Sequence, residues 1–219
     1  MEQNNKPITQ IFNLIILDAS GSMLPIQQTI INTFNELIQS IQASEQRGPD
    51  IPQWIKLVRF NGNGIHEITP VSPAKDAVLL NTDNYQPSHF TPLYDAIGIS
   101  VTKLQAFLEQ RESYRVLVTI ITDGEENRST EYTALSIQHL VTSLEEQGWL
   151  FTYMGANHQV KRVADLLKIS AYRQFDASDK GMIDSMLDFN HARERFVDSI
   201  RNRVMFDKST FFEARKKKK

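Results

Sequence analysis

The sequence contains no cysteine, which excludes disulfide bonds, thiolate nucleophiles and cysteine-based zinc sites. It also lacks any apolar stretch long enough to span a bilayer. The beginning of the chain, MEQNNKPITQ, is polar and does not show the charged-then-apolar pattern of a secretory signal. From these absences we expect a cytoplasmic protein that makes no membrane contact.

An excess of charge of one sign is missing as well. The chain carries 24 Lys and Arg against 26 Asp and Glu in 219 residues, and its net charge of -2 gives no general attraction to nucleic acid or anionic membranes. The local exception is the basic run Arg215–Lys219. Because like charges repel one another, we expect residues 207–219 to form a disordered tail that contacts nucleic acid weakly at most.

Several enzyme motifs are also absent. Nothing resembles Gly-x-x-x-x-Gly-Lys, which excludes a Walker-type nucleotide site. Ser20 and Ser22 lack the flanking glycines of a nucleophile elbow, and no histidine stands at a plausible triad position, so a serine hydrolase is disfavoured. The histidines are scattered along the chain without zinc-binding spacing.

What the sequence does contain is a series of short apolar runs that predict strands in the interior of a sheet. These runs are Ile11–Leu17, Ile55–Phe60, Val116–Ile121, Leu150–Met154 and Ala171–Phe175. The first and third are nearly continuous aliphatic runs, as is typical of parallel strands covered by helices on both faces. A sixth strand is expected around Ile65–Val71, after an Asn-Gly-rich turn, as an antiparallel strand at the sheet edge.

Helical patterns separate these strands. Apolar residues recur with the spacing of one helix face in Ile30–Ile41 and again in Leu93–Leu108, and further helices are expected at about Glu131–Gln147, His158–Lys168 and Asp179–Val204. The alternation predicts the α/β class, a doubly wound, mostly parallel sheet of about six strands with helices on both faces. We expect one domain over residues 11–206, after a polar lead of residues 1–10.

Three polar loops lie at the predicted carboxyl ends of the strands, where sheets of this kind bind ligands. Their oxygen-bearing side chains are Asp18, Ser20 and Ser22 after the first strand, Thr91 before the second helix, and Asp123 after the third strand. Each loop alone has a simpler explanation, because such residues commonly form helix caps and turns, and Thr91 occupies a predicted N-cap position. Two converging carboxylates, however, would repel each other, and a divalent cation would compensate their charge.

The residues Asp18-Ala19-Ser20-Gly21-Ser22, Thr91 and Thr122-Asp123-Gly124 resemble the metal-ion-dependent adhesion site of von Willebrand factor A (vWA) domains. That family's pattern is Asp-x-Ser-x-Ser, a Thr from a second loop and an Asp from a third, and this sequence matches every position. The resemblance extends over the order of strands and helices from about Ile11 to Val204. It is strongest to the stand-alone bacterial and phage-type domains, which often contain TDGEEN followed by a Gly-Trp strand.

The resemblance implies that Ser20, Ser22 and Thr91 supply hydroxyl oxygens to the ion, while Asp18 and Asp123 supply charge directly or through water. An all-oxygen set suits Mg²⁺, for which Mn²⁺ or Ca²⁺ could substitute. The implied function is a non-enzymatic interaction module that binds an Asp or Glu carboxylate of a partner protein through the ion. Related domains serve AAA-type ATPases and stress or defence complexes, which are the expected class of partner.

The neighbours of these residues have separate interpretations. We expect Asp95 to orient the loop of Thr91, and we interpret Glu125 and Glu126 as solvated loop residues or acids at a helix start. His89 is expected to be structural or simply exposed.

Two alternatives stay open. A haloacid-dehalogenase-type phosphatase also begins with an apolar strand ending in Asp and uses Mg²⁺, but it needs a second carboxylate where this chain has Ser20. The second alternative is a metal-independent scaffold protein with the same fold.

Overall fold

The computed structural model describes residues 9–48, 50–156 and 159–213. Its strands are β1 (Gln10–Asp18), β2 (Gln53–Asn61), β3 (Gly64–Pro73), β4 (Tyr114–Thr122), β5 (Leu150–Ala156) and β6 (Ala171–Phe175). The α-helices are α1 (Gln27–Arg47), α2 (Leu93–Leu108), α3 (Ala134–Glu146), α4 (Val160–Leu166) and α5 (Asp179–Arg201). The short 3₁₀ helices are η1 (Gly21–Ile26), η2 (Ala74–Asp76) and η3 (Lys208–Thr210).

The strands form one sheet in the order β3-β2-β1-β4-β5-β6. All neighbouring pairs are parallel except β2 and β3, which form an antiparallel hairpin at the edge. The predicted fold class is therefore confirmed, including the antiparallel edge strand. Strand order reverses between β1 and β4, which lie side by side with Leu17 opposite Ile121. This reversal is the place where a doubly wound sheet opens a crevice for ligands.

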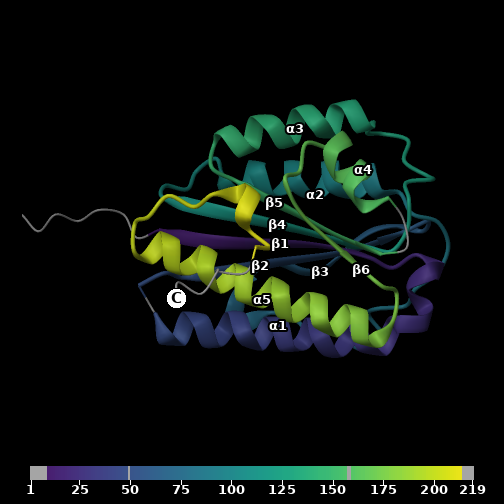
Figure 1. Ribbon diagram of the computed structural model, residues 1–219, viewed down its shortest axis with the longest axis horizontal. Coiled ribbons are helices and arrows are strands. Elements are labelled where there is room, and N and C mark those ends of the chain that lie inside the picture. Colours follow the sequence, from purple (N-terminus) through teal and green to yellow (C-terminus); the bar gives the residue numbers. More distant parts are fainter. Residues whose placement is uncertain (1–8, 49, 157–158, 214–219) are drawn as a thin grey trace, which may run out of the picture.

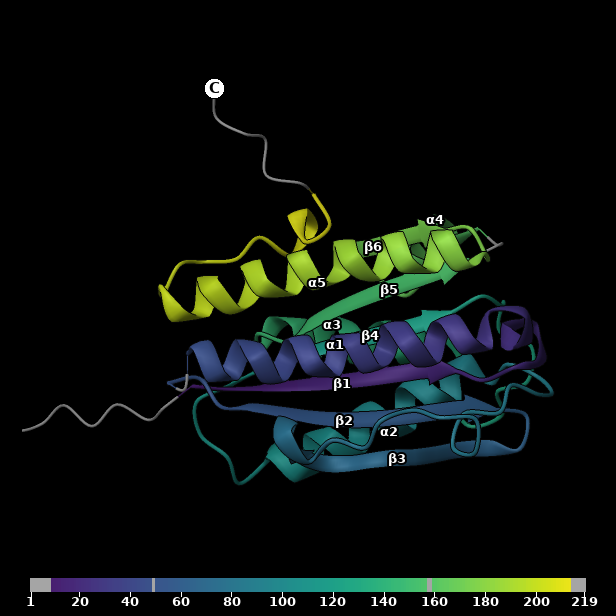
Figure 2. The same ribbon diagram turned by 90° about the horizontal axis from the view of Figure 1, so that it is seen from below.

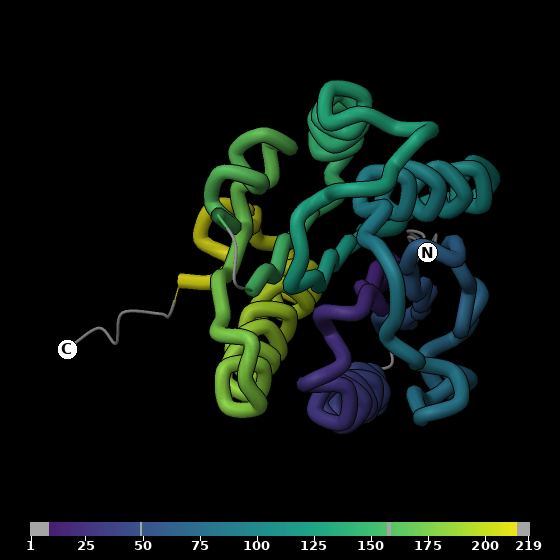
Figure 3. Tube along the Cα trace, turned by 90° about the vertical axis from the view of Figure 1, so that its right-hand side faces the viewer, coloured from purple at the N-terminus to yellow at the C-terminus, as the bar shows by residue number. Residues whose placement is uncertain are grey.

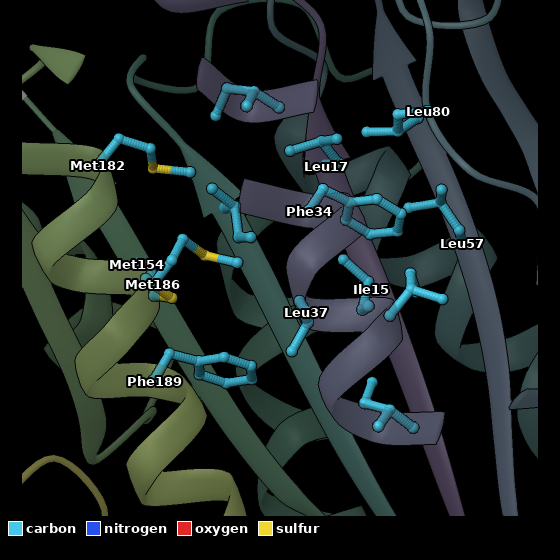
Figure 4. Close-up of a cluster of buried hydrophobic side chains, with 14 of the residues drawn as sticks. Ile15, Leu17, Phe34, Leu37, Leu57, Leu80, Met154, Met182, Met186 and Phe189 are labelled. Carbon is cyan, nitrogen blue, oxygen red and sulfur yellow. The ribbon is translucent and has the colours of Figure 1, made fainter. Parts of the chain in front are cut away.

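Helices cover both faces of the sheet. Figures 1 and 2 show α1 and α5 on one face and α2, α3 and α4 on the other. Because side chains alternate along a strand, Ile15 and Leu17 of β1 pack toward α1 and α5, whereas Leu14 and Ile16 pack toward α2 and α3. Figure 4 shows the first of these layers, with side chains of α1 and α5 meeting over the sheet. Burial on both faces explains why β1 is almost entirely aliphatic.

One polar contact is buried in this apolar layer. Arg193 of α5 is 1% exposed, and its guanidinium donates a hydrogen bond of 3.0 Å to the Gln53 Oε1 atom at the start of β2. The next residue, Glu194, pairs with Arg47 of α1 at 3.0 Å. These contacts fasten the middle of α5 to both the sheet and α1.

Some helices are shorter than predicted. Helix α3 begins after Thr133, whose side chain and Ser136 form a reciprocal capping box, rather than at Glu131. Helix α5 ends before the predicted Val204 because Arg203 adopts a left-handed conformation with φ of 55°. The predicted start of α4 at His158 lies outside the described residues. None of the helices in the described ranges is long and apolar enough to cross a membrane.

Residues 207–213 do not form the disordered tail predicted from the sequence. They contain η3, and Phe211 is completely buried, with its ring centroid 5.9 Å from that of Phe189 on α5. The backbone carbonyl of Phe211 also accepts a hydrogen bond from Arg195. The prediction of a disordered tail rests on the basic run Arg215–Lys219. It gives no weight to the aromatic pair Phe211–Phe212, which precedes that run. Residues 1–8 and 214–219 lie outside the described ranges.

Candidate metal centre

The predicted metal ligands gather at the carboxyl ends of β1 and β4, where the strand order reverses. Figure 3 looks onto this end of the molecule, where the loops meet. Asp18 is the last residue of β1, Asp123 follows β4 directly, and Thr91 lies just before α2. Ser20 lies on the turn between β1 and η1, and Ser22 is the second residue of η1.

The hydroxyl and carboxylate groups approach one another closely. The Ser22 hydroxyl donates to Asp123 Oδ1 at 2.6 Å and lies 3.1 Å from the Ser20 hydroxyl. The Thr91 hydroxyl lies beside Gly124, because a Cβ atom built on that glycine would be only 3.1 Å from Thr91 Oγ1 and 3.8 Å from Ser22 Oγ. Loops far apart in the sequence thus bring these groups into one cluster.

Burial distinguishes the members of the cluster. Four of them are nearly inaccessible, with exposed fractions of 0% for Asp18, 2% for Ser20, 3% for Thr91 and 6% for Asp123. Ser22 is exposed and lies at the rim. The cluster is therefore mostly buried, with one solvent-accessible member.

Asp18 is held in an environment that disfavours its charge. Burial raises the pKa of its carboxyl from the ordinary 3.8 to about 6, and the nearby Asp123 carboxylate adds to this rise. Hydrogen bonds from the Thr122 hydroxyl, at 2.6 Å, and the Ser20 amide, at 2.7 Å, act in the opposite direction. No Lys or Arg forms an ion pair with Asp18 in the part of the chain that the structure describes. A cation would supply the missing compensation.

The backbone of Asp18 is fixed by a buried tyrosine. The hydroxyl of Tyr85, which is fully buried, donates to the Asp18 carbonyl oxygen at 2.7 Å. The Gly21 amide in turn donates to the His89 carbonyl at 3.1 Å, which joins the first loop to the loop of Thr91. His89 itself is exposed, as expected, and has a positive φ of 66°.

The capping role predicted for Thr91 is wrong. Helix α2 starts at Leu93, with Pro92 at the N-cap position and no capping side chain from that residue. Its first amides are instead satisfied from another loop, because Glu126 Oε2 accepts from the Tyr94 amide at 2.9 Å. The sequence could not reveal this cap, since the acceptor lies more than thirty residues further along the chain.

The two acids near the centre behave differently from expectation. Asp95 accepts hydrogen bonds from the amides of residues 130–132, so it orients the loop after β4 and not the loop of Thr91. Glu125 is exposed, as predicted. Glu126 is neither a solvated residue nor an acid at the start of its own following helix, because its carboxylate binds amides of α2 and of its own loop.

Thr122 and Asn127 have roles that the sequence patterns did not predict. Thr122 donates to Asp18 and accepts from the Gly124 amide at 3.1 Å. Asn127 pairs with the backbone of Thr91 in both directions. The available signal for Thr122 was a hydroxyl at the last position of an otherwise aliphatic strand.

The proposed metal ligands include few charged groups. In the described ranges there is no group of three or more His, Asp or Glu side chains that could hold a metal ion. The cluster offers two carboxylates and three hydroxyls instead. Such all-oxygen sets suit hard cations, and Mg²⁺ in particular keeps several water ligands of its own.

Comparisons with known proteins show the fold. No family model and no curated protein matches the sequence. Among solved structures, the chain is similar to the SpRpn10 VWA domain, with 10% identity, 81% of this chain and 93% of that chain covered, and a TM-score of 0.56. It is similar to the vWF domain of the type V pili tip protein Mfa5 from Porphyromonas gingivalis, with 7% identity, coverages of 92% and 98%, and a TM-score of 0.57.

A third similar structure is the manganese-loaded TRAP protein of Plasmodium vivax, with 18% identity, coverages of 81% and 73%, and a TM-score of 0.52. Together with the strand order, these similarities show that the chain has the vWA fold. At such low identities they show the fold alone.

Proposed function

We propose that this domain binds a divalent cation, Mg²⁺ in the first place, and through it an acidic residue of a partner protein. The proposed ligands are Asp18, Ser20, Ser22, Thr91 and Asp123. The observation that carries the proposal is the convergence of two carboxylates and three hydroxyls from separate loops at the point where the strand order reverses.

The residues present fit a hard cation. The buried Asp18 carboxylate has a raised pKa and no basic partner among the described residues, so a bound cation would relieve an unfavourable charge. The hydroxyls of Ser20 and Ser22 are close enough to act together. Mn²⁺ or Ca²⁺ would be accepted by the same oxygens, and one protein of similar fold, TRAP, has been solved loaded with manganese.

The charge balance of the site favours a carboxylate as ligand. Two carboxylates neutralise a divalent ion, while hydroxyls contribute oxygen atoms without further negative charge. When bound, the ion would supply an open coordination position to an incoming Asp or Glu. The exposure of Ser22 at the rim of the cluster supports a site that a partner can reach from solvent.

The site geometry favours binding over catalysis. A phosphatase of the haloacid-dehalogenase type would need Asp18 as nucleophile and an acid at position 20. Here both Asp18 oxygens accept short hydrogen bonds, one from the Ser20 amide and one from Thr122. The hydroxyl of Ser20 cannot act as a general acid or base near neutral pH. We therefore propose a non-enzymatic module. The proposed cytoplasmic location, and a partner of the AAA-type ATPase or stress and defence class, rest on the sequence alone.

Titration calorimetry with MgCl₂ on protein freed of metal by EDTA tests the metal site. We expect one binding event, lost in Asp123→Ala and retained in Asp76→Ala, which removes an exposed carboxylate elsewhere. Absence of binding, or equal binding by Asp123→Ala, would leave the metal-independent scaffold as the better interpretation.

The partner is tested separately, by affinity capture from the native host with and without EDTA. The proposal expects proteins that the wild type retains in Mg²⁺ and releases in EDTA. The Ser20→Ala/Ser22→Ala double variant should not retain them. Capture that ignores both EDTA and the double substitution argues for contacts elsewhere on the fold.

A further inference from the structure

The loop between β4 and α3 is joined to the start of α2 by a continuous set of hydrogen bonds. The side chains responsible are Asp95, Glu126 and Asn127, which we call the clamp. The loop carries Asp123 at its start, and the start of α2 follows Thr91 directly. The clamp therefore connects the two segments that hold two of the proposed metal ligands.

Asn127 makes the most direct connection. Its side-chain Oδ1 accepts from the Thr91 backbone amide at 2.9 Å, and its backbone amide donates to the Thr91 carbonyl at 3.2 Å. Both polar groups of the Thr91 backbone are thus engaged by one residue of the other loop. The position of the Thr91 side chain follows from the position of Asn127.

Glu126 binds both segments at once. Its Oε2 accepts from the Tyr94 amide at 2.9 Å and from the Ser129 hydroxyl at 2.7 Å, while Oε1 accepts from the Arg128 and Ser129 amides at 2.7 and 2.6 Å. A carboxylate at the first turn of α2 also complements the positive end of the helix. Its negative charge is therefore directed at amides of the protein.

Asp95 completes the clamp from the side of α2. Its carboxylate accepts from the amides of Thr130, Glu131 and Tyr132, at 2.8, 2.9 and 2.7 Å. The ring of Tyr132 then lies directly on Gly98 of α2, since a Cβ atom on that glycine would collide with the ring. The far end of the loop is held against the same helix as its beginning.

We propose that Asp95, Glu126 and Asn127 are positioning residues of the metal centre, which set the separation of Thr91 and Asp123 before any cation binds. This inference rests on the proposed function. The clamp also directs the carboxylates of Asp95 and Glu126 to amides and a hydroxyl of the protein, so that Asp18 and Asp123 are the two carboxylates left among the proposed ligands.

A purely structural clamp would have different consequences. It would stabilise the fold but leave the metal affinity of the folded protein unchanged. The two roles separate when the dissociation constant for Mg²⁺ and the melting temperature in EDTA are measured on the same variants. Asn127 is the best residue to change, because it is exposed and its substitution removes no packed side chain.

The experiment compares Asn127→Ala, Asn127→Asp and Asn202→Ala by calorimetric titration with MgCl₂. We expect Asn127→Ala to weaken Mg²⁺ binding by about 10- to 100-fold, as for residues that orient metal ligands, while folding in EDTA is retained. Asn127→Asp keeps the acceptor oxygen and should bind Mg²⁺ no more weakly than the wild type. Asn202→Ala removes an exposed asparagine beyond the far end of α5 and should change nothing.

The outcomes are distinguishable. If the wild type binds Mg²⁺ and Asn127→Ala binds it with the same affinity, the clamp proposal is overturned. The proposed function is then unaffected. Weakened binding in both Asn127→Ala and Asn127→Asp also overturns it, because the acceptor would not be the cause. Wild-type protein that binds no Mg²⁺ overturns the proposed function and the clamp's role with it.

Discussion

Replacing Asp18 by Asn should make the domain more stable and remove its proposed metal binding. The amide has the shape of the carboxylate, and its Oδ1 can still accept from the Ser20 amide. Its Nδ2 can donate to the Thr122 hydroxyl, whose own proton is then directed to the Gly124 carbonyl, 3.1 Å away. The hydrogen-bond pattern is kept while the buried charge is lost.

The magnitude follows from the pKa of Asp18, which burial raises from 3.8 to about 6. Because the folded protein holds this proton more tightly than the unfolded chain, the stability it gives is complete below pH 4 and is lost as pH rises through 6. At pH 7.5 the charged Asp18 therefore costs about 3 kcal/mol of unfolding free energy. Asp18→Asn should recover about this amount, or roughly 6 to 12 °C in melting temperature for a domain of this size.

Urea unfolding in EDTA at pH 7.5 and pH 4.5 measures the effect. The advantage of Asp18→Asn should shrink to about 1 kcal/mol at pH 4.5, where the wild-type carboxyl is mostly protonated when folded. Adding MgCl₂ at pH 7.5 should stabilise the wild type, by about 2.7 kcal/mol at a hundred times its dissociation constant, and leave the variant unchanged. A variant no more stable than the wild type in EDTA, or equally stabilised by Mg²⁺, would refute the reasoning.

Three further substitutions probe the site and the core. Gly124→Ala should weaken Mg²⁺ binding in calorimetry at least tenfold, since its Cβ would crowd Thr91 Oγ1 at 3.1 Å and displace that hydroxyl. Tyr85→Phe should lower the unfolding free energy by about 1 to 3 kcal/mol in urea titrations, because the buried Asp18 carbonyl loses its donor. Phe211→Ala should cost about 3 to 5 kcal/mol in the same assay, as for other fully buried aromatic residues.

Each of these has a clear contrary result. Unchanged Mg²⁺ affinity in Gly124→Ala would mean that Thr91 lies outside the metal's reach. A Tyr85→Phe variant as stable as the wild type would show that water replaces the lost donor. For Phe211→Ala, a loss as small as that of the exposed Met205→Ala would contradict the burial of the segment after α5.

The sequence predicted the central sheet because its strands are buried on both faces. β1 and β4 carry almost uninterrupted aliphatic runs, and no other arrangement hides such runs as well. The Asn-Gly turn before Gly64 likewise indicated the hairpin of β3. These signals are local, because each depends on residues that are adjacent in the sequence.

Features that depend on distant partners were beyond such patterns. The cap of α2 comes from Glu126, and Asp95 binds a loop that begins after another strand. Each pairing needs two segments to be already in place. The burial of Phe211 depends in the same way on α5, which lies beneath it. The convergence of the five predicted ligand residues could be foreseen because strand ends meet at one edge of the sheet, whereas their supporting contacts follow no such rule.

The buried guanidinium of Arg193 limits how α5 can respond to events at the opposite end of the molecule. Moving the helix along its axis by one turn, about 5.4 Å, would take that group away from Gln53, while its other partner, Glu194, would move with it on the same helix. Leaving the buried partners of such a hydrogen bond unsatisfied typically costs about 1 to 3 kcal/mol. A ligand could drive such a shift only by preferring the moved state by roughly 5- to 150-fold. Ligands that bind both positions of the helix with similar affinity should therefore leave it where it is.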